Sequence, residues 1–200
     1  MKISKDDFSS VFAQVITSKR PLILSPRGKS VSFLCTPVAM TDEAIIFRNS
    51  IPVDILPEIV NSTEFSLVCE NYQLVSAALF AHGTDIRFPT HHISVLPQSR
   101  SDERHVFSTE EHAEIVIHHP FDAGTQLRRR LYDLSKGGLS FRARGQTRLM
   151  QPGRILSQMQ LIQAGRESEL KSGRVIYIKQ IFEESGRHFH QVGVQFISTP

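Results

Sequence analysis

The sequence predicts a mainly β protein made of two small antiparallel β domains, with one helix ahead of the first. Apolar and polar residues alternate in many short segments, and glycine- and proline-rich turns separate these segments. The length of 200 residues suits one large or two small domains. Many short strands with frequent turn signals are typical of a sandwich or a small barrel.

A helix is expected at residues 4–18. Ser4 is a good N-cap, and Pro21 prevents the helix from continuing. The apolar residues recur at helical spacing and form one face, which we interpret as a core-packing surface. They are Phe8, Val11, Phe12, Val15 and Ile16.

The rest of the first half has the pattern of short strands. Its residues alternate between apolar and polar positions, and prolines and glycines interrupt them. Strands are predicted at residues 22–24, 31–35, 43–48, 64–70, 74–80, 86–88 and 93–96.

The polar, irregular segment at residues 97–100 is the best domain boundary. We therefore predict an N-terminal β domain at residues 1–97 and a second domain at residues 98–200. A loop is expected at residues 120–124. The second domain is predicted to contain strands at 113–118, 126–132, 139–144, 155–162, 174–182 and 188–197.

The composition limits the classes of protein to which this chain can belong. Hydrophobic residues make up 40% and charged residues 22%, as in ordinary soluble proteins, and the net charge of +3 mildly favours anionic ligands. No apolar run approaches the roughly 18 residues of a membrane helix, and the N-terminus lacks a secretion signal. Cys35 and Cys69 fit no metal spacing. A cytoplasmic protein with reduced thiols and no membrane insertion is expected.

Arg100 and Arg104 stand four residues apart, at and just after the predicted boundary. Guanidinium groups bind phosphates through paired hydrogen bonds and stack on rings. Two of them on one side of the chain suit a ligand with more than one phosphate. Asp102 and Glu103 lie between them, so a solvated, self-paired charge cluster is the alternative.

Asp133, Ser135 and Gly138 form a second motif within a turn. The Asp133 carboxylate can accept two N–H donors from a guanine edge, and the Ser135 hydroxyl can donate or accept beside it. Glycine allows a positive φ or the close approach of a ligand or backbone. The alternative is a β-hairpin connection without a ligand.

Together, and in this order, the two motifs resemble those of the PilZ domain, over residues 100–200. The resemblance implies a six-stranded antiparallel β-barrel that binds the bacterial second messenger cyclic di-GMP. It also implies that the arginines contact phosphates and stack on guanine, and that the turn residues bind guanine edges. The implied ligand-binding residues are Arg100, Arg104, Asp133, Ser135 and Gly138.

The order of the two domains resembles the flagellar-brake type of PilZ protein, in which a split barrel precedes the messenger-binding barrel. The resemblance implies a receptor that is not an enzyme and needs no cofactor. Ligand binding would change the interdomain arrangement and regulate a protein partner, such as a flagellar motor or other effector component. The output would be motility, biofilm formation or virulence.

Rival interpretations remain. The histidines lack the spacing of a familiar zinc site, and we find no familiar catalytic motif. A barrel that binds nucleic acid is a rival, although interleaved exposed aromatics are missing. A degenerate PilZ module that binds only protein is another. The arginines that favour nucleic acid are Arg128, Arg129, Arg130, Arg142, Arg144 and Arg148.

Overall fold

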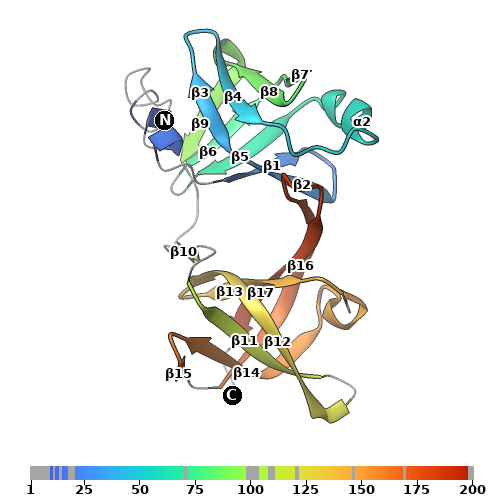
Figure 1. Cartoon of the computed structure of the whole chain (residues 1–200). Helices are drawn as coiled ribbons and strands as arrows, with labels where there is room; N and C mark the ends of the chain where they lie inside the picture. The colour runs from blue at the N-terminus through green and yellow to red at the C-terminus, as the bar shows by residue number, and fades with distance from the viewer. Residues whose placement is uncertain are drawn as a thin grey trace. The chain divides into compact units, whose positions relative to one another are not determined.

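The structure is a computed structural model in which strands predominate (Figure 1). The mainly β, two-domain fold predicted from the sequence is confirmed. One compact unit comprises Met1–Ser99 with Ile181–His188, and the other comprises Arg100–Gln180 with Phe189–Pro200. The described residues are 10, 12–13, 15–17, 21–69, 72–97, 104–107, 111–119, 122–145, 147–168 and 170–197.

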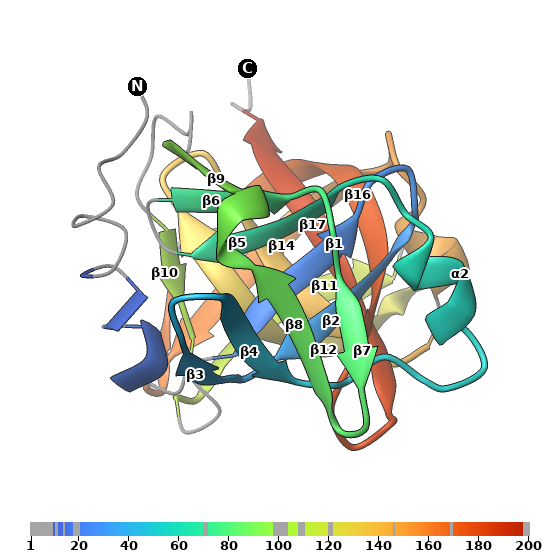
Figure 2. The same cartoon turned by 90° about the horizontal axis from the view of Figure 1, so that it is seen from above.

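The first unit contains two antiparallel sets of strands. One set has the order β2-β1-β5-β6-β9, and the other has the order β3-β4-β8-β7. Figure 2 shows β4 and β8 side by side, in agreement with their pairing. The elements are β1 (Leu22–Pro26), β2 (Val31–Cys35), β3 (Pro37–Met40), β4 (Ala44–Arg48), α2 (Leu56–Val60), β5 (Phe65–Cys69), β6 (Tyr72–Ser76), β7 (Phe80–His82), β8 (Asp85–Pro89), η1 (Thr90–His92) and β9 (Ile93–Pro97).

Phenylalanines fill the core of this unit. The Phe47 ring meets the Phe88 ring edge-on, with 5.7 Å between centroids. Phe12 is fully buried and packs edge-on against Phe47 at 6.1 Å. The core role predicted for Phe12 is thus confirmed, and the described residues between 10 and 17 are helical. Ser4 and Phe8 lie outside the described residues.

Residues 181–188 belong to the first unit although they come late in the sequence. The Phe182 ring stacks on Phe33, with centroids 5.6 Å apart. The Thr36 N–H donates to the Glu184 carboxylate at 3.2 Å. The sequence predicts one division, between residues 97 and 98, and gives no sign of this returning segment.

The second unit contains a closed, antiparallel six-stranded barrel (Figure 1). The order is β14-β11-β12-β13-β17-β16, and the pairing of β14 with β16 closes the ring. β10 pairs with β12, and β15 pairs with β14. The elements are β10 (Arg104–Val106), β11 (Ala113–His119), β12 (Asp122–Ser135), β13 (Gly138–Ala143), η2 (Thr147–Met150), β14 (Ile155–Gln163), β15 (Arg166–Glu167), β16 (Lys171–Phe182) and β17 (His188–Ile197).

One strand prediction and one loop prediction need correction. The predicted strand at residues 74–80 ends early, because the Ser76 hydroxyl donates to the Ala78 carbonyl and turns the chain. The predicted loop at residues 120–124 is partly strand, since β12 begins at Asp122. In the described part of the chain, no helix has the length and apolar character needed to cross a membrane.

Candidate functional site

The β12–β13 turn organises the candidate site. Ser135, the last residue of β12, pairs with Gly138, the first residue of β13. Only Lys136 and Gly137 therefore lie in the turn itself. The Ser135 hydroxyl donates to the Gly138 carbonyl at 3.2 Å and holds the turn closed. This arrangement fixes Ser135 relative to the rest of β12.

Glycine at position 138 is required by a close backbone approach. A Cβ atom there would lie 2.3 Å from the carbonyl oxygen of Val194 on β17. Gly138 does not adopt a positive φ. Of the two roles that the sequence suggests for this glycine, positive φ is therefore wrong, and the approaching group is the protein's own backbone.

Arg104 reaches this turn from β10. In the antiparallel register Arg104 lies opposite Ser135, and Val106 lies opposite Asp133. Directly opposed residues point to the same side of a sheet, and side chains two apart in a strand share a face. The side chains of Arg104, Asp133 and Ser135 therefore share one face, which we call the outer face of the barrel. Arg100 lies outside the described residues.

Arg104 and Asp133 form an ion pair on the outer face. The Arg104 Nη1 atom lies 3.4 Å from each carboxylate oxygen of Asp133. The Asp133 side chain is 8% exposed and that of Arg104 is 33% exposed. The contact is longer than the roughly 2.7–2.9 Å of a strong charge-assisted hydrogen bond. The guanidinium thus neutralises a buried carboxylate while part of it remains accessible.

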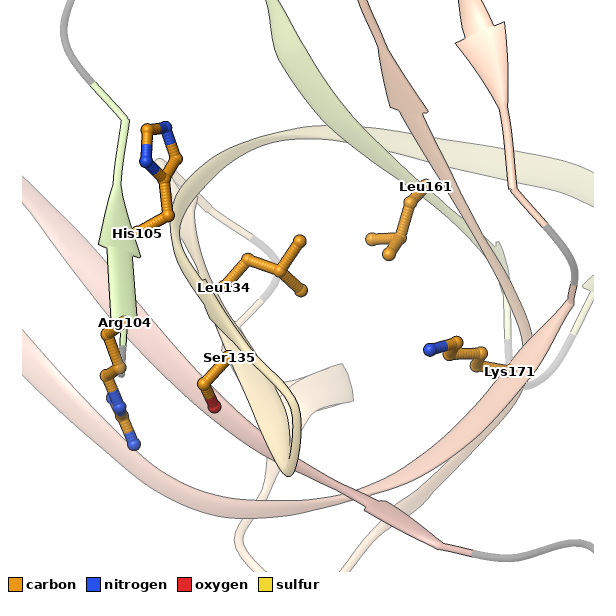
Figure 3. A pocket seen from close by; sticks show the side chains of 6 residues that line it. All are labelled: Arg104, His105, Leu134, Ser135, Leu161 and Lys171. Atoms are coloured by element: carbon orange, nitrogen blue, oxygen red, sulfur yellow. The ribbon is translucent and has the colours of Figure 1, made fainter. Parts of the chain in front are cut away.

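The opposite face of the β10–β12 ribbon borders a cavity of about 390 Å³. His105 and Leu134 are paired across the two strands on this face. In Figure 3 the side chains of Leu134 and Leu161 point into the space between the strands, whereas those of Arg104 and Ser135 point away from it. Leu134 and Leu161 thus enter the cavity, which residues from both faces of the ribbon line. Its lining residues are Arg104, His105, Leu134, Ser135, Leu161 and Lys171.

His105 and Lys171 line the cavity but belong to no motif that marks them in the sequence. The His105 Nε2 atom lies 2.9 Å from the Glu111 carboxylate, and the Lys171 ammonium lies 4.7 Å from the centre of the Phe196 ring. The alternation of side chain direction along β12 could have indicated that Leu134 points into the cavity. No signal in the sequence pairs β10 with this strand.

The described residues bear on two other kinds of chemistry, metal binding and thiol reactivity. Among the described residues, no group of three or more His, Cys, Asp or Glu side chains is placed to hold a metal ion. Burial raises the pKa of the Cys35 thiol to about 12, although a hydrogen bond with Ser50 opposes the shift. The thiol is therefore protonated and unreactive at neutral pH.

Comparison with known proteins identifies the fold. No protein-family model and no curated protein matches this sequence. MrkH of K. pneumonia in complex with c-di-GMP has a TM-score of 0.73 and 15% identity, over 100% of this chain and 88% of that chain. The chain has the fold of the PilZ-domain c-di-GMP receptors.

Two further structures have the same PilZ receptor fold. MrkH, described as a c-di-GMP-dependent transcription regulatory factor, has a TM-score of 0.69 and 16% identity over 100% of this chain and 86% of that chain. YcgR from Escherichia coli, in complex with c-di-GMP, has a TM-score of 0.56 and 15% identity over 100% of this chain and 85% of that chain. In both cases the alignment spans the two units.

Proposed function

We propose that this chain is a non-enzymatic receptor for cyclic di-GMP. The observation that carries the proposal is the meeting of Arg104, Asp133 and Ser135 on the outer face. These residues come from two segments that are far apart in the sequence. They combine a phosphate-binding cation with an acceptor for guanine N–H groups.

Each residue has a distinct role in this proposal. Asp133 accepts hydrogen bonds from the donor edge of guanine, and Ser135 contacts the same base. When the ligand binds, Arg104 gives up part of its contact with Asp133 and binds a phosphate. Arg100 supplies a second cation from the preceding segment. Gly138 acts indirectly, because it lets β17 approach the turn and so fixes Ser135.

The similar structures support the choice of ligand. The MrkH structure with the TM-score of 0.73 and the YcgR structure were each solved in complex with c-di-GMP. The residues implied by the PilZ resemblance, where described, lie on β10 and at the β12–β13 turn of this chain. We therefore infer the same ligand for this chain.

We further propose that binding changes the arrangement of the two units and thereby controls a protein partner in motility or biofilm formation. The arginine pair follows the predicted domain boundary, so a ligand held there acts on the connection. Solution scattering with and without cyclic di-GMP tests this step. An unchanged profile at saturating ligand would rule it out.

Nucleic-acid binding is a second candidate function. MrkH is described as a transcription regulatory factor, and Arg128 on β12 of this chain is exposed. Fluorescence anisotropy with a labelled DNA duplex, with and without cyclic di-GMP, tests it. DNA binding that requires cyclic di-GMP and weakens steeply with salt is the supporting result. Absence of DNA binding, with or without cyclic di-GMP, would reject it.

Calorimetry on Arg104→Ala tests the primary proposal. A hydrogen bond to a charged group contributes about 1.5–3 kcal/mol, so affinity should fall about 10- to 100-fold. Arg128→Ala is the matched control. Its guanidinium lies in the same barrel, 3.9 Å from Glu114, and is exposed. Equal affinities for the two variants would contradict the proposal. If the wild type does not bind cyclic di-GMP at all, the alternative of a PilZ module that contacts only protein is favoured.

A further inference from the structure

The outer face continues beyond Asp133 onto β13 and β17. Ser140 of β13 lies directly opposite Asp133 and is fully buried. The Gln191 side-chain amide donates to the Ser140 hydroxyl at 2.9 Å. Because side chains alternate along a strand, Ser140 and Arg142 share this outer face. The face that holds the candidate site thus carries an additional guanidinium.

Arg142 lies on a platform of two aromatic rings. Its guanidinium carbon is 5.3 Å from the centre of the Tyr132 ring and 4.7 Å from the centre of the Phe189 ring. The two ring centres are 6.3 Å apart, so the group lies across both rings. Tyr132 and Phe189 are buried, on the two strands that flank β13. Stacking fixes the plane of the guanidinium and therefore the direction of its N–H edge.

The platform remains uncharged at physiological pH. Burial is the main cause that raises the pKa of Tyr132, and the charge of Arg142 opposes this shift. Tyr132 therefore stays a neutral phenol beside the guanidinium. Because the phenol is neutral, it does not form an ion pair with the Arg142 guanidinium.

Asp133 and Arg142 are complementary to the two edges of guanine. Arg142 lies two residues beyond Ser140, the partner of Asp133, and the register of β12 and β13 shifts between Asp133 and Leu131. Asp133 can accept from the N1 and N2 donors, whereas an arginine fork matches the O6 and N7 acceptors. Adenine offers an amino group in place of O6, so an arginine at this edge favours guanine.

We propose that Arg142 is a further ligand-contacting residue, which binds the O6/N7 edge of the guanine whose donor edge meets Asp133. This inference rests on the proposed function and assigns part of its base specificity to Arg142. Arg104, by contrast, contributes phosphate affinity that does not depend on the base.

Cyclic di-GMP analogues with 7-deazaguanine test this assignment without altering the protein. The analogue lacks the N7 acceptor but keeps both phosphates and the donor edge. Loss of one half of a bidentate contact should weaken wild-type binding about 10-fold. Calorimetric titration of the wild type with the two ligands measures this ratio, and equal affinities would overturn the assignment.

Two variants identify the residue responsible. In Arg142→Lys, which keeps the charge but lacks the fork, the preference for cyclic di-GMP over the deaza analogue should disappear. In Arg104→Ala both ligands should weaken equally and the preference should remain. If Arg142→Lys retains the full preference, the inference is wrong while the receptor function stands. If the wild type binds neither ligand, the receptor function and the inference fail together.

Discussion

Arg104 and Asp133 face each other across β10 and β12, with the Arg104 Nη1 atom 3.4 Å from both carboxylate oxygens of Asp133. The arginine thus compensates a carboxylate that is almost fully buried. Such compensation matters because an unpaired buried charge is strongly destabilising. A ligand that engages both groups must offer donors to Asp133 and an anion to Arg104, and cyclic di-GMP meets both conditions.

Replacing Asp133 should alter base preference more than overall affinity. In Asp133→Ala the acceptor for the guanine donor edge is lost, while Arg104 becomes free to contact phosphate. We expect the ratio of cyclic di-GMP affinity to cyclic di-AMP affinity to fall about 10-fold or more. Parallel calorimetric titrations measure this ratio, and an unchanged ratio would remove Asp133 from the site.

Gly138→Ala should destabilise the barrel. The added Cβ would lie 2.3 Å from the Val194 carbonyl oxygen, so β17 must shift away from β13. Overpacking of this kind costs about 1–3 kcal/mol and should lower the Tm by several degrees. Gly145→Ala is the matched control, because its Cβ would meet no atom within 4 Å. Thermal unfolding followed by circular dichroism compares the two, and equal Tm values would contradict the packing described here.

Cys35 should resist alkylation in the native protein. Its thiol is buried, and its pKa of about 12 leaves almost no thiolate at pH 8. Iodoacetamide followed by peptide mass spectrometry should modify Cys35 slowly in buffer and rapidly in urea. Equal rates in the two conditions would show that the site opens freely.

Asp122 should titrate below its ordinary pKa of 3.8. The hydroxyl of Thr125 and the N–H of Gly124 donate to its carboxylate and lower the pKa. A lowered folded-state pKa means that these bonds stabilise the fold above the ordinary value. Their contribution is lost as the pH falls through the folded value. NMR titration of the carboxyl group measures the midpoint, and a value at or above 3.8 would contradict the two bonds.

The sequence predicts the strands of the second unit well because alternation and turn chemistry are local signals, whereas the closed barrel is implied by the PilZ resemblance. The hairpin around Asp133 and Ser135 follows from residues within a few positions of one another. Contacts over long sequence distances leave no such signal. The pairing of β10 with β12 and the packing of Phe182 on Phe33 join segments that only the tertiary fold brings together.

Side-chain direction explains much of what the sequence leaves open at the site. Arg142 resembles any exposed strand arginine until Tyr132 and Phe189 are brought beneath it from neighbouring strands. Gly138 fits a positive-φ turn equally well until β17 is seen to approach it. In both cases the deciding neighbour is distant in the sequence.

A calorimetric titration of the full chain with cyclic di-GMP and, under the same conditions, with cyclic di-AMP tests the proposed ligand and its base preference together. We expect saturable binding of cyclic di-GMP and affinity for cyclic di-AMP weaker by about 10-fold or more. Absence of heat with cyclic di-GMP, or equal affinity for both ligands, would contradict the proposal that this outer face binds guanine.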